Sequence, residues 1–432
     1  MNKLKNMAFF PLCQGEHRKS QIFFIFDGIL INAAATLTNG VFLSGYLVSL
    51  KASDFLVGIL NNSATWSLII SLFSFLIFER MEKRKGLLIT LNIISRALIC
   101  SIVFLPQLIK DSDTVLALTS GIIIAGNLLW SIYSVGIMVW MISLLPNKAK
   151  NRYIYLRMLC LRFSFTFFTL IMGLVLDWFG KSQTGFTIVF SVSLVLSLID
   201  AIVLMNTHEP ANNVDRTRKS LELGLFLEPL KNKEFRTYLL FIFCFYFSLN
   251  LSSSYTALYQ IRYLKLNYSF ISIINVIAYV NMIVCTQLWG KLEYQKGLKF
   301  VLGMTALFIV SEFFLYGFMT QKTLYLLFLT PFLAGIGNSG FNVATVTYRY
   351  NIIPEEGHKT IYEGWFGAVF GLSALLGPMV GKLIMEILPP VRGPIFQYSN
   401  FQIMYLISFI VGLSVVLLMF FRPLKKQQKP DS

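Results

Sequence analysis

Charged residues are scarce in this chain. Only 13% of its 432 residues are charged and 56% are hydrophobic, whereas a soluble domain carries about 25% charged residues. The shortage of charge excludes an ordinary soluble globular protein, and the excess of apolar residues excludes intrinsic disorder. A membrane-spanning helix needs roughly 20 apolar residues, so the length accommodates twelve spans with loops and tails. We therefore predict a polytopic, all-α membrane protein.

Histidine and cysteine are also rare, at three and five residues. His17, His208 and His358 stand singly in polar segments, and four of the cysteines lie inside apolar runs. No Cys/His zinc spacing, disulfide framework or Ser/His/Asp grouping is present in the sequence. We therefore expect no metal, no cofactor and no enzyme site.

Acidic residues are fewer than basic ones, and the net charge is +16. A basic soluble protein would suggest nucleic acid as a partner. Here the Lys and Arg residues are dispersed over many short loops, which is typical of the cytoplasmic loops of membrane proteins. We therefore expect no nucleic-acid partner.

Twelve apolar runs are too long for strands and lack a period of two. With the N-terminus inside, the inner segments hold 26 of the 37 Lys and Arg residues and the outer loops hold 7. This asymmetry predicts that both termini are cytoplasmic. The runs lie near 21–50, 55–78, 87–109, 114–145, 153–178, 183–206, 237–261, 268–289, 298–320, 324–350, 360–388 and 400–421.

The two halves of the chain align at an offset of 211 residues. Glu82 to Leu87 and Glu293 to Leu298 both read E-x-x-K-G-L, and Gly126-Asn127 aligns with Gly337-Asn338. Matches at one offset and at similar depth indicate a parallel repeat. We predict an N-terminal six-helix bundle (1–206), a cytoplasmic linker (207–236) and a C-terminal six-helix bundle with a short basic tail (237–432).

With these features the chain resembles the major facilitator superfamily along essentially its whole length. The family's loop pattern between helices 2 and 3, roughly G-x-L-a-D-r-x-G-r-k, is similar to residues 290–299 and, more distantly, to residues 79–86. Tyr294 and Lys83 occupy the family's Asp positions, and the G-P-x-x-G-G motif of proton-driven drug exporters is missing from helix 5. The resemblance implies a gating loop that includes Glu82, Gly86, Gly290, Glu293 and Gly297.

The resemblance also implies that helices 1, 4, 7 and 10, which are the runs 21–50, 114–145, 237–261 and 324–350, line a central cavity. An unpartnered amide in hydrocarbon costs several kcal/mol, so the amides on these helices face either a wet cavity or another helix. Trp130 could also stack on a flat ligand or simply pack in the core. The candidate cavity residues are Asn32, Asn39, Asn127, Trp130, Tyr133, Asn250, Tyr255, Asn338 and Asn342.

Ionisable residues inside spans suggest function. Asp27 lies about two turns into helix 1, at a depth comparable to Arg157 and Arg162 of helix 5. Exchange of an arginine partner for a proton at Asp27 would couple transport to the proton gradient; the alternatives are a static salt bridge and snorkelling arginines. Glu363, near the start of helix 11, is a further coupling candidate.

Four other charged residues inside spans are expected to form structural ion pairs. Arg96 and Asp200 lie on helices that are peripheral in the family, and Glu312 and Lys382 lie in the outer halves of their helices. We expect Arg96 to pair with Asp200, and Glu312 with Lys382.

The sequence thus predicts a monomeric secondary active transporter of a bacterial plasma membrane, in contact with lipid. It would move a small organic solute by alternating access, with protons as the expected coupling ion and no ATP-binding motif to supply energy. The alternatives are a non-transporting membrane sensor or immunity protein and a lipid-type flippase on the same scaffold.

Overall fold

The computed structural model describes residues 17–78, 81, 83–145, 150–209, 223–354, 359–388 and 399–421. The regular structure in these ranges is helical throughout, with no strand. The expected all-α class is therefore confirmed for the described part of the chain. The helices fall into two compact units. The first comprises Met1–Glu228, Ser254–Ile273 and His358–Leu375, and the second comprises Pro229–Ser253, Ile274–Gly357 and Leu376–Ser432.

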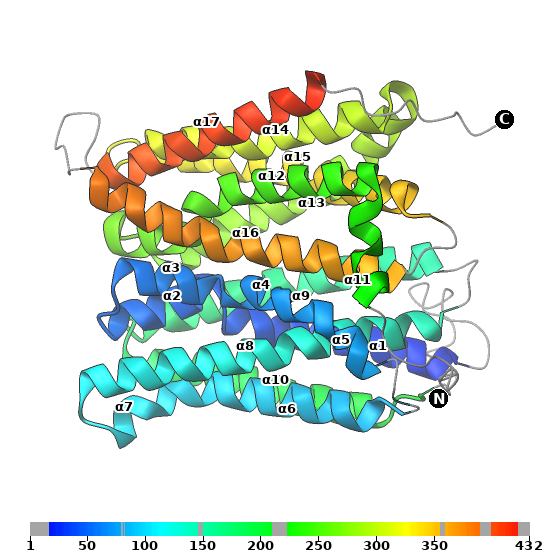
Figure 1. Cartoon of the computed structure of the whole chain (residues 1–432). Coiled ribbons are helices and arrows are strands. Elements are labelled where there is room, and N and C mark those ends of the chain that lie inside the picture. The colour runs from blue at the N-terminus through cyan, green and yellow to red at the C-terminus, as the bar shows by residue number, and fades with distance from the viewer. Residues whose placement is uncertain are drawn as a thin grey trace. The chain divides into compact units, whose positions relative to one another are not determined.

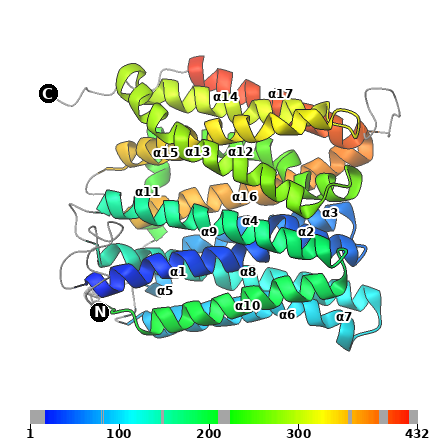
Figure 2. The same cartoon turned by 180° about the vertical axis from the view of Figure 1, so that it is seen from behind.

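The helices up to residue 209 belong to the first unit. Among them, α6, α8 and α10 run side by side in the front view (Figure 1) and in the view from behind (Figure 2). The bounds are α1 (Arg18–Leu37), α2 (Gly40–Ser49), α3 (Asp54–Asn61), α4 (Ser63–Trp66), the 3-10 turn Ser67–Ile70, α5 (Ser71–Phe78), α6 (Lys85–Ser101), the 3-10 turn Ile102–Phe104, α7 (Leu105–Leu108), α8 (Ser112–Ser143), α9 (Lys150–Trp178) and α10 (Gln183–Met205).

The later helices are α11 (Leu223–Lys231), α12 (Lys233–Leu258), a π-helical turn (Tyr259–Tyr263), α13 (Tyr268–Lys296), α14 (Leu298–Gly317), a 3-10 turn (Leu324–Phe328), α15 (Thr330–Ile352), α16 (Lys359–Ile387) and α17 (Ser399–Phe421). Within the second unit α14 packs against both α15 and α17. The end of α12, the start of α13 and the start of α16 belong to the first unit.

Eleven spans in the described residues are long and apolar enough to cross a membrane. A further pair, Asp54–Asn61 and Ser63–Phe73, bends by 46° at Asn62 and makes a twelfth if it is counted as one span. The chain is therefore a multi-pass membrane protein.

The first span differs from the uninterrupted helix expected over 21–50, because the helix breaks between α1 and α2. Asn39 is extended at φ −135° and ψ 179°, and Gly40 takes φ +57°, in the left-handed region that favours glycine. Asn39 Nδ2 donates to the carbonyl of Ala35 at 2.9 Å, which satisfies one of the carbonyls freed by the break. The sequence Thr-Asn-Gly is a turn signal, but it lies inside a long apolar run that by itself predicts one continuous helix.

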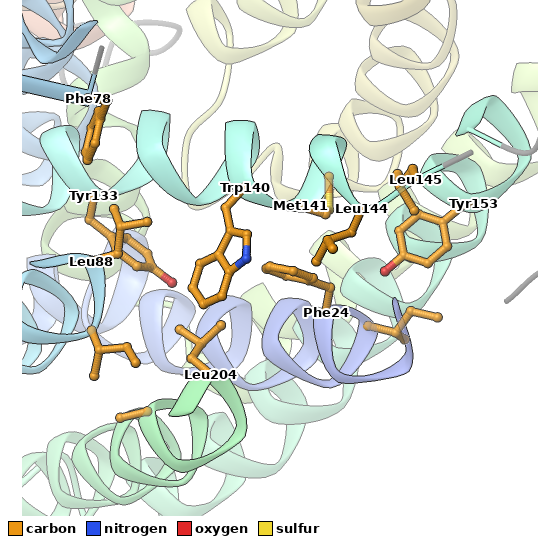
Figure 3. Packing of buried hydrophobic residues seen from close by; sticks show 13 residues of the cluster. Phe24, Phe78, Leu88, Tyr133, Trp140, Met141, Leu144, Leu145, Tyr153 and Leu204 are labelled. Atoms are coloured by element: carbon orange, nitrogen blue, oxygen red, sulfur yellow. The ribbon is translucent and has the colours of Figure 1, made fainter. Parts of the chain in front are cut away.

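An apolar core of the first unit joins α1, α6, α8, α9 and α10. Trp140 of α8 packs edge-on against Phe24 of α1 with ring centroids 5.3 Å apart. Figure 3 shows Trp140 and Tyr133 projecting from α8, with Leu204 of α10 close to Trp140. This apolar packing holds α8 against α1.

Glycines allow the closest helix contacts. In the first unit Gly126 of α8 lies against the carbonyl of Ser95 on α6; in the second unit Gly337 of α15 lies against the backbone of α14. A Cβ at Gly337 would lie 2.9 Å from both the Ile309 nitrogen and the Thr305 carbonyl oxygen. Because those atoms belong to helix backbone, they cannot move aside without shifting the helix.

Gly337→Ala is therefore expected to lower the free energy of unfolding by about 1–3 kcal/mol, the usual effect of overpacking. The matched control is Gly121→Ala in α8, where a Cβ would meet nothing within 4 Å. The measurement is thermal unfolding in detergent. A Gly337→Ala protein as stable as Gly121→Ala would contradict the close contact of α14 and α15.

Candidate functional site

The first unit contains a buried ion pair between α1 and α9. Arg157 Nη2 lies 2.9 Å from Asp27 Oδ2, and Arg157 Nε donates to the carbonyl of Phe24 at 3.0 Å. The Asp27 side chain is 1% exposed and that of Arg157 11%. Of the two arginines considered as partners for Asp27, Arg157 is therefore the one in direct contact.

Gly28 makes room for this pair. A Cβ at Gly28 would lie 2.9 Å from Arg157 Nε, so a larger residue there would push the guanidinium away. Tyr133 of α8, which Figure 3 shows beside the apolar core, donates its hydroxyl to Asp27 Oδ1 at 3.4 Å. Both oxygens of Asp27 thus have donors, from two different helices.

A second carboxyl group, that of Asp200 on α10, faces Asp27. The two side chains are within hydrogen-bonding reach of each other, and Asp200 is fully buried. Asn92 Nδ2 of α6 donates to Asp200 Oδ2 at 2.7 Å. Asp200, which was expected to pair with Arg96, forms no ion pair with a described residue, because its closest charged neighbour is Asp27.

Arg96 instead covers an aromatic ring. Its guanidinium carbon lies 3.8 Å from the centroid of Trp130, and Nη1 reaches Thr38 Oγ1 at 3.4 Å. Nε and Nη2 have no hydrogen-bond acceptor among the described residues. The Trp130 and Tyr133 rings are 4.9 Å apart, so Arg96, Trp130, Tyr133 and Asp27 form a continuous row that ends at the break in the first span.

This cluster (Asp27, Asn92, Arg96, Trp130, Tyr133, Arg157 and Asp200) draws side chains from five helices. It contains two carboxyl groups and two guanidinium groups in a region that excludes water. Such groups are costly in a membrane and persist when they are paired or have a functional role. Its chemistry suits movement of a proton and an associated change of ion-pair partners.

In the first unit, the expected cavity amides make hydrogen bonds within the protein. Asn32 Nδ2 donates to the Leu161 carbonyl at 2.8 Å, and Asn127 Nδ2 donates to Ser63 Oγ at 2.7 Å. Asn39 bonds its own helix, as described above. These amides therefore bond to other helices or to their own helix, which is the alternative to facing a wet cavity.

The remaining cavity candidates lie on α12 and α15. Asn338 bonds the carbonyl of Ala334 at 2.9 Å, Asn342 is exposed, and Asn250 is buried beside Gly377. Tyr255 belongs to the first unit and packs fully buried against Gly58.

The remaining charged candidates are more dispersed. Arg162 and Glu363 are half-buried in α9 and α16. Lys382 lies 3.5 Å from Glu386, its neighbour one turn along α16, whereas Glu312 forms no ion pair with any residue that the structure describes. The expected Glu312–Lys382 pair is therefore not found.

Of the expected gating-loop residues, Glu82 lies outside the described residues. Gly86 and Gly290 have open space around them, Glu293 is half-buried in α13, and Gly297 takes φ +85° between α13 and α14. At the start of α6, Glu209 accepts hydrogen bonds from the backbone nitrogens of Arg84 and Lys85, where a carboxylate stabilises a helix N-terminus.

Two carboxylates that the sequence did not single out join distant segments of the first unit. Asp54, at the start of α3, binds the Arg262 guanidinium and the Tyr263 hydroxyl. Asp177, near the end of α9, accepts hydrogen bonds from the Tyr268 and Ser269 nitrogens, at 3.1 and 2.8 Å. Both are loop-proximal acidic residues, and nothing in their spacing signals these partners.

A pocket of about 190 Å³ lies in the second unit, lined mainly by apolar groups such as Phe241, Leu302 and Met419. None of its lining residues is charged. The polar cluster is therefore the stronger candidate site for transport.

The sequence model of the Major Facilitator Superfamily matches residues 25–311 and 262–432. The chain belongs to this superfamily of membrane transporters. Family and fold are thus those of transporters and not of enzymes.

Solved transporters share the fold. A mutant of the nucleoside transporter NupG superposes with a TM-score of 0.71 at 13% identity, over 93% of this chain and 100% of that one. The D-xylose–proton symporter gives a TM-score of 0.69 at 16% identity, over 93% and 97%. At such identities the likeness concerns the fold alone.

One curated relative is similar in sequence over a shorter stretch. The class H tetracycline resistance protein of Pasteurella multocida is 31% identical over 98 residues. The match spans 23% of this chain and 24% of that protein.

Removing one partner of the Asp27–Arg157 pair is expected to destabilise the protein more than removing both charges. Arg157→Gln leaves a buried carboxylate without its cation, which costs about 3–5 kcal/mol, and the double variant Asp27→Asn/Arg157→Gln recovers part of that loss. The measurement is thermal unfolding in detergent of both single variants and the double variant.

The control is Lys382→Gln, which breaks the more exposed Lys382–Glu386 pair and is expected to cost about 0.5 kcal/mol. Strictly additive effects of the Asp27 and Arg157 substitutions would show that the two side chains are not coupled.

Proposed function

We propose that the chain is a secondary active transporter of a bacterial plasma membrane that moves a small organic solute by alternating access, coupled to protons. The observation that carries the proposal is the Asp27–Arg157 pair, a buried carboxylate held by an exchangeable cation. A charge inside the membrane must stay compensated. A proton on Asp27 would take over that compensation and release Arg157, so protonation and helix movement become linked.

The proposed solute is neutral or weakly charged, aromatic and amphipathic. The Trp130 and Tyr133 rings lie 4.9 Å apart near the break in the first span, and discontinuous helices commonly form substrate sites in transporters. The partial likeness to a tetracycline resistance protein supports export of drug-like compounds. Binding at Asn127, Asn250, Tyr255, Asn338 or Asn342 belongs to the same proposal.

The proposed topology has two six-helix halves, 1–206 and 237–432, joined by a cytoplasmic linker, with both termini cytoplasmic. The bias of Lys and Arg towards one set of loops supports it. So does the equivalent packing of Gly126 and Gly337, which align at the repeat offset, against the preceding span of each half. We further propose that the protein acts as a monomer.

Proton coupling is tested in liposomes with an inward proton gradient and a luminal pH dye, using tetracycline as the first solute and then pools of amphipathic aromatics. We expect solute-dependent proton flux in the wild type and its loss in Asp27→Asn, which removes the titrating group. Asp113→Asn, in the exposed first turn of α8, is the matched control. Flux that persists in Asp27→Asn overturns the coupling role, and absence of flux with every solute favours a sensor, an immunity protein or a flippase.

The contact of Asp54 with Arg262 and Tyr263 is proposed to hold the outer side closed. Partly exposed ion pairs contribute about 1 kcal/mol at most, equivalent to about a fivefold population change. Asp54→Asn is therefore expected to speed labelling of a buried Ser254→Cys by a membrane-impermeant maleimide severalfold, with Asp113→Asn again as control. Equal labelling rates would contradict an outer gate at Asp54.

A further inference from the structure

Asp200 is a buried carboxyl group that the coupling mechanism above does not use. It lies on α10 and faces Asp27 of α1, within hydrogen-bonding reach. Its Oδ2 accepts a hydrogen bond from the side-chain amide of Asn92 at 2.7 Å. Its Oδ1 is buried and accepts no hydrogen bond from any donor that the structure describes.

The polar groups around Asp200 other than Asn92 bond to other partners, two of them to Asp27 itself. Arg157 of α9 donates hydrogen bonds from Nη2 to Asp27 and from Nε to the Phe24 carbonyl. The Tyr133 hydroxyl of α8 also donates to Asp27. Arg96 of α6 lies on the Trp130 ring and reaches Thr38. Cys100, one turn further along α6, bonds Ser193 of α10. No described cation lies in direct contact with Asp200.

Two facing carboxylates in a water-free site do not both stay ionised, and such pairs hold a single proton between them. A proton on Asp200 Oδ1 would turn the unpartnered acceptor into a donor to Asp27 and remove the repulsion. We propose that Asp27 and Asp200 share one proton, carried on Asp200 in the arrangement seen, and that this pair is the proton carrier of the transport cycle. The proposal rests on the proposed proton-coupled function and names its proton site.

Release of the proton to water would leave Asp200 as an anion beside its neighbour. Arg96 is the nearest cation without a carboxylate partner, and it lies one helical turn from Asn92, on the face of α6 that already contacts Asp200. Its Nε and Nη2 have no acceptor among the described residues. Deprotonation therefore draws Arg96 from Trp130 to Asp200 and uncovers a ring face beside the break in the first span. The Arg96 guanidinium would then cover the Trp130 ring when Asp200 is protonated and expose it when Asp200 is ionised, so that proton binding and solute binding oppose each other.

The test is infrared difference spectroscopy of the purified, full-length protein between acidic and alkaline pH. We expect a carbonyl band from a buried, protonated carboxyl group that disappears at high pH and is missing in Asp200→Asn. Glu312→Gln, which removes a carboxyl group of the second unit, is the matched control and keeps the band. A band that is unchanged in Asp200→Asn overturns the proposal.

A second variant keeps both carboxyl groups and so avoids dependence on the folding of Asp200→Asn. Asn92→Ala removes the hydrogen bond to Asp200 Oδ2 and is expected to shift the frequency of the same band. A band at the wild-type frequency would show that the proton resides elsewhere. In parallel, the emission of Trp130, taken as wild type minus Trp130→Phe, is expected to change over the pH range in which the band disappears.

Transport separates this inference from the proposed function. Loss of proton flux in both Asp27→Asn and Asp200→Asn supports both. Flux lost in Asp27→Asn but intact in Asp200→Asn, with the band unchanged, leaves the proposed function standing and removes Asp200 from it. Absence of solute-driven flux in the wild type overturns the proposed function, while the infrared result still decides whether the pair holds a proton.

Discussion

A charge inside a membrane must have a partner, and this requirement governs the first unit of the protein. Asp27 is surrounded by α1, α8, α9 and α10, where no water can solvate its carboxylate. Arg157 supplies the opposite charge, and Gly28 leaves the space for it. The apolar contacts of Trp140 and Phe24 then fix the helices that bring these groups together.

The same requirement links the ion pair to the break in the first span. Thr38, directly after the last residue of α1, contacts Arg96, which in turn lies on Trp130. The break therefore lies at one end of a row of polar and aromatic groups that leads to Asp27. Such a row gives a protonation change a route to the rings that we propose to bind solute, because each member contacts the next.

Much of the fold was predictable because hydrophobic length alone determines a spanning helix. The family was recognised from the number of apolar runs, the charge bias and the repeated E-x-x-K-G-L sequence, and the match to the superfamily confirms it. The site was only partly predictable. A pair of Asp27 with an arginine of α9 followed from depth, but the choice of Arg157 depended on the helix rotation that places Gly28 against it. Asp200 was expected to pair with Arg96 because opposite charges attract, whereas packing of α10 against α1 sets it beside Asp27.

The central claim is that proton binding in the buried cluster is linked to solute binding. The most direct test counts the protons released or taken up when a solute such as tetracycline binds to the detergent-solubilised protein, by calorimetry in buffers of different ionisation enthalpy. Linkage requires that a solute which changes the affinity for a proton also exchanges protons on binding. We expect proton exchange in the wild type and none in Asp27→Asn. Solute binding with the same proton exchange in both proteins would contradict it.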